Sequence, residues 1–246
     1  MNILAVSDIP SRSLEALVLR SPDALREVDA IISCGDLEKE YLEFLVDGVN
    51  RELFFVFGNH EGRWDLDEDI GFSPGEKILA KAKQLHRKIT KRIAGIKDLH
   101  GRVVAFREFL IVGFGGSMWY NGGENQYSEK EMAKVVASVA RRVRLLQLRD
   151  RLLGRAPKDV IVVSHAPPFG THDQPDLCHS GFKCFKAFCK QVKPLLWLHG
   201  HIHLTNSQHN QLSAEGHTSV LNTYGHKFIS IKAHKIDISP RPAVTV

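Results

Sequence analysis

Side chains that bind metal ions and carry protons occur in five short clusters of this sequence. The clusters are Asp8, Gly35-Asp36, Gly58-Asn59-His60-Glu61, His165 and Gly200-His201-Ile202-His203. Carboxylate and amide oxygens together with imidazole nitrogens suit Mn, Fe or Zn better than Ca or Mg alone. Two such ions about 3.5–4 Å apart neutralise the charge of a phosphate ester and activate water against it. The clusters therefore indicate a site for divalent metal ions.

Each cluster comes directly after a short apolar run. The runs are Asn2–Val6, Ala30–Ser33, Leu53–Phe57, Val160–Ser164 and Leu195–Leu198. They are rich in β-branched or aromatic residues and lack polar alternation, which is typical of strands buried on both faces. In open α/β sheets, ligands bind beyond the carboxyl ends of the strands. Parallel pairing of these runs would therefore bring the five clusters to one place.

Five stretches with helical periodicity lie between these runs. The predicted helices are Ser11–Arg20 with Ser11 as N-cap, Glu38–Val49, Glu76–Arg92, Ser128–Leu153 with a capping box, and Phe182–Val192. Further strands are expected at Leu99–Phe106, Phe109–Phe114, Thr218–Leu221 and Phe228–Ile238. Alternating strands and helices predict an α/β fold. We expect one domain over residues 1–246, with residues 62–98 as a candidate cap-like insertion.

The clusters occur in the order D…GD…GNHE…H…GHxH, between Asp8 and His203. This order resembles the calcineurin-like metallophosphoesterase superfamily. A lone GD or HxH would carry little weight, whereas five ordered elements at strand ends are a specific signal. The resemblance implies a four-layer α/β/β/α sandwich of two mixed sheets. It also implies hydrolysis of a phosphate mono- or diester by a metal-bound hydroxide at a dinuclear site.

The resemblance also implies a role for each cluster. Asp8 and His203 would hold the first metal ion, Asp36 would bridge the two ions, and Asn59, His165 and His201 would hold the second. His60 would lie beside the leaving-group oxygen as general acid or charge stabiliser. Arg63 and His179 are candidates for contact with the substrate. The implied cofactor is a pair of divalent ions, with Mn favoured and Fe or Zn as alternatives.

The tripeptide Asp8-Ile9-Pro10 departs from the family pattern. The family usually has D-x-H here, and that histidine is a further ligand of the first ion, whereas proline has no side-chain donor. Three protein ligands and water still make an acceptable catalytic site. A second hypothesis therefore stays open, in which the protein keeps the fold but is catalytically impaired and binds a metal ion or a phosphorylated ligand.

Single residues also have simpler interpretations. Asp8, Asp36 and Asn59 each fit an ordinary turn, so the metal-site hypothesis rests on the joint order of the clusters. Cys178, Cys184 and Cys189 lack the paired spacing of zinc ligands and are predicted to be buried thiols. The arginines between residues 141 and 155 favour a solvated helix face, while a nuclease or nucleic-acid-binding relative stays as a third hypothesis.

Composition indicates the class of protein. The chain has 246 residues, 43% hydrophobic and 25% charged, as in ordinary globular proteins, and its formal net charge is +5. No apolar run approaches the roughly 18 residues of a membrane span, and the first residues do not resemble a signal peptide. Four cysteines do not make a disulfide framework. We expect a cytoplasmic protein without membrane contact, acting on a phosphorylated small molecule or nucleotide.

Overall fold

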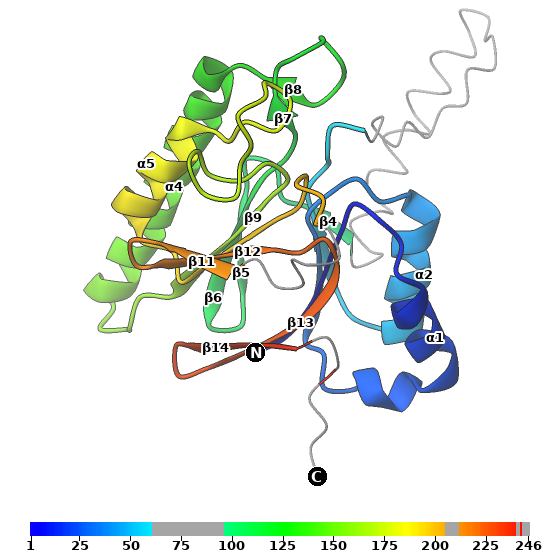
Figure 1. The fold of residues 1–246 in the computed structure, drawn as a ribbon. Helices are drawn as coiled ribbons and strands as arrows, with labels where there is room; N and C mark the ends of the chain where they lie inside the picture. The colour runs from blue at the N-terminus through cyan, green and yellow to red at the C-terminus, as the bar shows by residue number, and fades with distance from the viewer. Residues whose placement is uncertain (61–95, 205–211, 240–241, 243–246) are drawn as a thin grey trace, which may run out of the picture.

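Two six-stranded mixed β-sheets face each other, and helices cover their outer faces (Figure 1). The computed structural model describes residues 1–60, 96–204, 212–239 and 242. The first sheet consists, in spatial order, of β14 (Lys235–Ser239), β13 (Gly225–Lys232), β1 (Asn2–Ser7), β2 (Ala30–Ser33), β3 (Leu53–Phe55) and β4 (Ile96–Asp98). The second consists of β11 (Leu212–Glu215), β12 (Thr218–Asn222), β10 (Leu196–His199), β9 (Asp159–Ser164), β6 (Phe109–Phe114) and β5 (Val103–Phe106).

The helices form the two outer layers. Beside the first sheet lie α1 (Arg12–Arg20), the short 3-10 helix η1 (Pro22–Leu25) and α2 (Lys39–Val49). Beside the second lie α4 (Glu129–Leu152) and α5 (Lys183–Val192). A small two-stranded sheet pairs β7 (Ser117–Met118) with β8 (Gln126–Tyr127). The four layers confirm the α/β/β/α architecture expected from the sequence.

Strand β1 shows why the predicted strands lack polar alternation. Successive side chains of a strand point to opposite faces of its sheet. Ile3 and Ala5 belong to the apolar cluster between the two sheets, whereas Leu4 and Val6 pack with residues of α1 and α2. Both faces of the strand are therefore buried, as they are in sheets covered on both sides.

The five apolar runs all form strands, which are β1, β2, β3, β9 and β10. β1, β2 and β3 are parallel in the first sheet, and β9 and β10 are parallel in the second. The sequence did not predict β4 or β11, because both are short edge strands without a buried apolar face. β4 also forms the last three residues of the range 62–98, so these belong to the first sheet. The rest of that range, residues 62–95, lies outside the described residues. It includes the predicted helix Glu76–Arg92.

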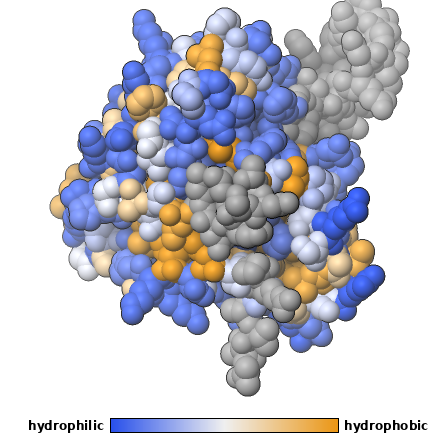
Figure 2. Space-filling view, viewed as in Figure 1, coloured by the Kyte–Doolittle hydropathy of each residue, from blue (hydrophilic) through white to orange (hydrophobic). Residues whose placement is uncertain are grey.

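Among the residues that the structure describes, no helix is both long enough and apolar enough to cross a bilayer. The face shown in Figure 2 is mostly hydrophilic, with separate apolar areas between the polar ones.

Two predicted helix starts are confirmed by their caps. The Ser11 hydroxyl accepts a hydrogen bond from the Leu14 amide at the start of α1. At the start of α4, the Ser128 hydroxyl accepts from the Glu131 amide, and the Glu131 carboxylate accepts from the Ser128 amide. These contacts satisfy amides that have no partner inside the helix.

Replacing Ser128 by alanine should lower the free energy of unfolding by about 1 kcal/mol, because the first turn of α4 loses its acceptor. Urea unfolding followed by far-ultraviolet circular dichroism measures the change. Ser138, exposed in the middle of the same helix, is the matched control. Ser138→Ala should leave the stability unchanged or slightly raised. Equal losses in both variants would contradict a capping role.

Candidate metal centre

Asp8 and Asp36 follow the carboxyl ends of the neighbouring parallel strands β1 and β2. Both adopt left-handed backbone conformations, with φ of 66° and 57°, and so does His201 after β10, with φ of 66°. Such conformations are costly for residues with a side chain and are concentrated at functional sites. The Asp8 amide donates to the Gly35 carbonyl at 3.0 Å, and the His201 amide donates to Oδ1 of Asp8 at 2.8 Å. Three turns from two sheets therefore meet at one place.

The glycines of the motifs make room for the two carboxylates. A Cβ atom at Gly58 would collide with the Asp36 carboxylate, and one at Gly200 would lie 2.8 Å from Oδ2 of Asp8. Gly35 has φ of +98°, and a Cβ there would lie 2.8 Å from Nδ1 of His165. The glycines therefore follow from packing around the site, in addition to their freedom in turns.

The Asp8 carboxylate has one satisfied and one unsatisfied oxygen. Oδ1 accepts from the His201 amide, whereas Oδ2 is buried and has no hydrogen-bond partner in the described part of the chain. Burial raises the pKa of Asp8 above its ordinary value. A buried carboxylate oxygen without a partner is costly unless a proton or a cation lies against it.

Asp36, Asn59 and His165 converge on one point. Nε2 of the fully buried His165 lies 2.9 Å from Oδ1 of Asn59 and 3.3 Å from Oδ2 of Asp36. Oδ1 of Asp36 accepts from the His60 amide at 2.9 Å, so the carboxylate is held from both sides. Ligand atoms of Asp8, Asp36 and His165 all lie within 4.8 Å of one another.

Two backbone carbonyls fix which nitrogen of each imidazole carries hydrogen. Nδ1 of His165 lies 2.8 Å from the Cys34 carbonyl, and Nε2 of His201 lies 2.8 Å from the Cys178 carbonyl. A carbonyl only accepts, so these two nitrogens carry hydrogen and donate. In the neutral rings, Nε2 of His165 and Nδ1 of His201 therefore carry the free lone pairs. Orientation of histidine by an outer acceptor is usual at metal sites.

The pKa values reflect the same convergence. Burial by itself would lower the pKa of His165, but the charge and hydrogen bond of Asp36 outweigh it and raise this pKa to about 9. Burial would likewise raise the pKa of Asp36, but His165 holds it well below its ordinary value. Burial and the neighbouring His165 charge lower the pKa of His201 to about 3, so its imidazole is neutral and able to bind a metal ion.

The donor set therefore fits a divalent cation. When His165 is neutral, its Nε2 lone pair faces two oxygen acceptors, and only a proton or a cation relieves the repulsion between them. The buried Oδ2 of Asp8 presents a further free acceptor beside them. Carboxylate, amide and imidazole together suit transition-metal ions.

The other predicted site residues in the described part of the chain are exposed or half-buried, and none belongs to the cluster of Asp8, Asp36 and His165. His60 has an exposed side chain, and His203 is exposed with its ring 5.0 Å from that of Tyr224. The half-buried His179 lies with its ring 5.2 Å from that of His201. Arg63 lies outside the described residues. The structure thus gathers Asp8, Asp36, Asn59, His165 and His201, and shows His203 turned towards Tyr224.

His199 does not replace the histidine missing at residue 10. Its Nδ1 donates to the Gly200 carbonyl at 2.9 Å, which leaves Nε2 as an acceptor for Nδ1 of His172 at 2.8 Å. Burial and the nearby His172 lower the pKa of His199 to about 3. Both of its ring nitrogens are therefore engaged away from the cluster formed by Asp8, Asp36 and His165.

Two residues at the rim of the centre, Tyr120 and Cys178, were not among the predicted site residues. The Tyr120 hydroxyl accepts a hydrogen bond from Nδ2 of Asn59 at 3.1 Å, which turns the amide oxygen towards His165. Cys178, in the loop before α5, and Cys184 are both half-buried, so the prediction of buried thiols is wrong for these two, whereas it is confirmed for Cys189. Ligand atoms of Asp176, Cys178 and His179 lie within 4.8 Å of one another, in a turn where Asp176 accepts from the His179 amide.

The calcineurin-like phosphoesterase family matches residues 1–204 of the chain. The chain belongs to this family. Family membership confirms the resemblance given by the five clusters and supports a metal-dependent phosphoesterase in general. Among curated proteins, none matches the chain significantly.

Solved structures of this phosphoesterase fold resemble the chain over nearly its whole length. The protein TT1561 of Thermus thermophilus has a TM-score of 0.58 and 18% sequence identity, covering 97% of both chains. A dimetal phosphatase from Danio rerio has a TM-score of 0.51 and 11% identity, covering 98% of this chain and 96% of that one. At identities this low, the structural likeness shows a shared fold and no more.

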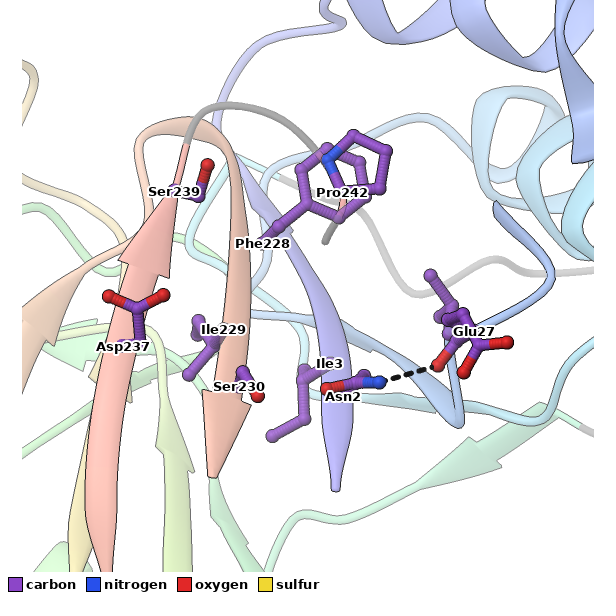
Figure 3. Close-up of a pocket in the computed structure, with 10 residues that line it drawn as sticks. Asn2, Ile3, Glu27, Phe228, Ile229, Ser230, Asp237, Ser239 and Pro242 are labelled. Atoms are coloured by element: carbon purple, nitrogen blue, oxygen red, sulfur yellow. Dashed lines mark hydrogen bonds between the residues drawn. The ribbon is translucent and has the colours of Figure 1, made fainter. Parts of the chain in front are cut away.

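Figure 3 shows a separate pocket of about 120 Å³. Asn2 and Ile3, at the start of β1, line it, and the Asn2 amide group donates to the Glu27 carbonyl at 2.9 Å. Asp8 lies beyond the other end of the same strand. The pocket is therefore separate from the candidate metal centre of this protein.

Titration of the His165 imidazole tests whether this ring is protonated beside Asp36 in the metal-free protein. Because Asp36 raises the pKa of His165 to about 9, this ring is protonated at pH 7 in the metal-free protein. A metal ion must displace that proton, so metal affinity should rise with pH and level off above about 9. Nuclear magnetic resonance of labelled histidine in chelator-treated protein reports the midpoint. A midpoint near the ordinary value of about 6.5 would contradict the arrangement.

Removing the Tyr120 hydroxyl tests the orientation of Asn59. Tyr120→Phe leaves Nδ2 of Asn59 without its acceptor, so Mn²⁺ affinity should fall about tenfold or more. Calorimetric titration with Mn²⁺ measures the change. Trp119→Phe, at the exposed neighbouring residue, is the matched control and should bind as the unaltered protein does. Equal affinity in all three proteins would exclude a role for the hydroxyl.

Proposed function

We propose that the protein hydrolyses a phosphate mono- or diester at a centre of two divalent metal ions, of which Mn is favoured and Fe or Zn are alternatives. The observation that carries this proposal is the convergence of acceptors at the strand ends, with Oδ2 of Asp8 buried and without a partner among the described residues. The family match over residues 1–204 supports it. The dimetal phosphatase from Danio rerio has the same fold and carries the proposed activity in its name.

In this proposal the residues act as their motif positions imply. The first ion is held by Asp8, Asp36 and His203, and the second by Asp36, Asn59, His165 and His201. The bound ions supply charge neutralisation at the phosphate and an activated water molecule. His203 has to turn from Tyr224 towards Asp8 to take part, since its ring lies 5.0 Å from the Tyr224 ring.

His60 is proposed to donate a proton to the departing oxygen or to stabilise its charge. The His60 amide donates to Asp36 at 2.9 Å, which fixes the backbone beside the centre, while the residue itself is exposed. A general acid needs this combination of an anchored backbone and an accessible ring. The half-buried His179, near His201, is proposed to contact the substrate, as is Arg63.

Pro10 favours a second candidate function. It is exposed and has no side-chain ligand where the family pattern has histidine, so the first ion has at most three protein ligands. A protein that binds a metal ion or a phosphorylated ligand without turnover would fit this departure. The two candidates differ in whether loading with metal produces hydrolysis.

Hydrolysis of bis-p-nitrophenyl phosphate and p-nitrophenyl phosphate by chelator-treated protein, titrated with Mn²⁺, tests the proposal. We expect saturable activity that Asp36→Ala abolishes, because both ions lose a shared ligand. Asp47→Ala, at an exposed aspartate of α2, is the matched control and should keep full activity. Mn²⁺, Fe²⁺ and Zn²⁺ that bind without any turnover of either ester would contradict the proposal and favour the second candidate.

Replacing Pro10 by histidine separates the two candidates further. If the missing ligand at residue 10 weakens binding of the first ion, Pro10→His should raise Mn²⁺ affinity about tenfold or more. Pro10→Ala controls for loss of the proline ring. Binding and turnover that are the same in all three proteins would show that residue 10 does not contribute to the centre.

A further inference from the structure

Exposed leucines gather on the second half of α4. Of the ten large hydrophobic side chains that are exposed in the described part of the chain, three lie on this helix, namely Leu145, Leu148 and Leu152. Their exposed fractions are 65%, 49% and 79%. Single exposed leucines are ordinary, but three on one helix face form an apolar patch of the kind that marks an interaction site.

The spacing of these leucines is that of one heptad of a coiled-coil seam, because the preceding a and d positions hold Ser138 and Arg141. Leu145, Leu148 and Leu152 lie three and four residues apart, which are the a, d and a positions of a heptad. The opposite positions b, c and f face the protein core. They hold the buried residues of the helix, which are Met132, Val136, Val139, Ala140, Val143 and Asp150. α4 therefore packs on the second sheet with one face and presents a second, separate seam to solvent.

The positions that flank the seam all carry the same charge. Positions e and g hold Arg142, Arg144, Arg149 and Arg151, and all four side chains are exposed. Arg149 forms an ion pair with Asp150 at 3.2 Å, whereas the other three form no ion pair within the described residues. In coiled coils, the charges at e and g select the partner helix.

We propose that this seam binds a helix of another protein that has leucine-like residues at a and d and acidic residues at e and g. Apolar contact with Leu145, Leu148 and Leu152 would supply the buried area. Glutamates flanking the partner's seam would pair with the arginines of α4 and select for it.

The same features disfavour other occupants. A second copy of this chain would place arginine rows against arginine rows, whether the helices ran parallel or antiparallel, and like charges there repel. Nucleic acid would pair with the arginines but would leave the leucines uncovered. An anionic membrane surface could take up basic amphipathic helices, but the seam lacks the aromatic residues enriched at such interfaces.

A pair of synthetic peptides tests the proposal with the full chain. Both have three heptads with leucine at a and d and a fluorescent label, and they carry glutamate or lysine at e and g. We expect the glutamate peptide to bind saturably and to become helical on binding, and the lysine peptide to bind at least about tenfold more weakly. Fluorescence anisotropy at physiological salt measures both affinities.

Variants of the seam separate specific docking from charge attraction. The double variant Leu145→Ser with Leu148→Ser should weaken the glutamate peptide at least about tenfold, since it removes the apolar contact. Leu19→Ser, at a leucine of α1 that is 72% exposed, is the matched control and should bind normally. The double variant Arg144→Glu with Arg151→Glu should reverse the preference towards the lysine peptide. Circular dichroism melting checks that every variant is folded.

Four results would overturn the proposal. The first is equal binding of both peptides, and the second is equal binding by the leucine variant, which would show charge attraction alone. The third is binding of a DNA duplex or of phosphatidylglycerol vesicles more tightly than the glutamate peptide, with the same variants weakening it. The fourth is self-association of the chain that the leucine variant abolishes, which would assign the seam to a second copy.

Discussion

The structure depends on a group of buried hydrogen-bond acceptors that lie close together and outnumber the donors beside them. Asp8, Asp36 and Asn59 direct oxygens towards the space beside Nε2 of His165, and Oδ2 of Asp8 has no partner there among the described residues. One proton on His165 holds the pair with Asp36 together in the metal-free protein. Such an arrangement is costly in a protein interior unless positive charge completes it. The fold maintains it, which is the strongest physical reason to regard it as a site for cations.

The rest of the architecture serves to hold these groups in place. Two sheets end at the same point, so Asp8 comes from β1 and His201 from the turn after β10, and a hydrogen bond of 2.8 Å joins them. Left-handed turns at both residues allow this approach, and Gly200 leaves room for the carboxylate. The carbonyls of Cys34 and Cys178 then orient the two imidazoles, so that backbone as well as side chains define the chemistry.

Sequence patterns predicted the strands that carry the centre because those strands are buried on both faces and therefore mostly apolar. β4 and β11 have no such signal, since they are edge strands with polar, partly exposed side chains. The gathering of Asp8, Asp36 and His165 followed from their places at strand ends. Tyr120 lies in a loop whose path no local pattern fixes, and the carbonyl of Cys34 acts through the backbone, which is the same for every residue type. The seam on α4 is readable from the sequence only after the structure shows which face of the helix is buried.

Anomalous diffraction from crystals grown with Mn²⁺ tests the central claim most directly, because it locates the ions without requiring a substrate. The account predicts a strong peak within ligand distance of Nε2 of His165 and the Asp36 carboxylate, and a second beside Oδ2 of Asp8. Manganese bound only elsewhere, with His165 and Asp36 still in direct contact at saturating Mn²⁺, would contradict it.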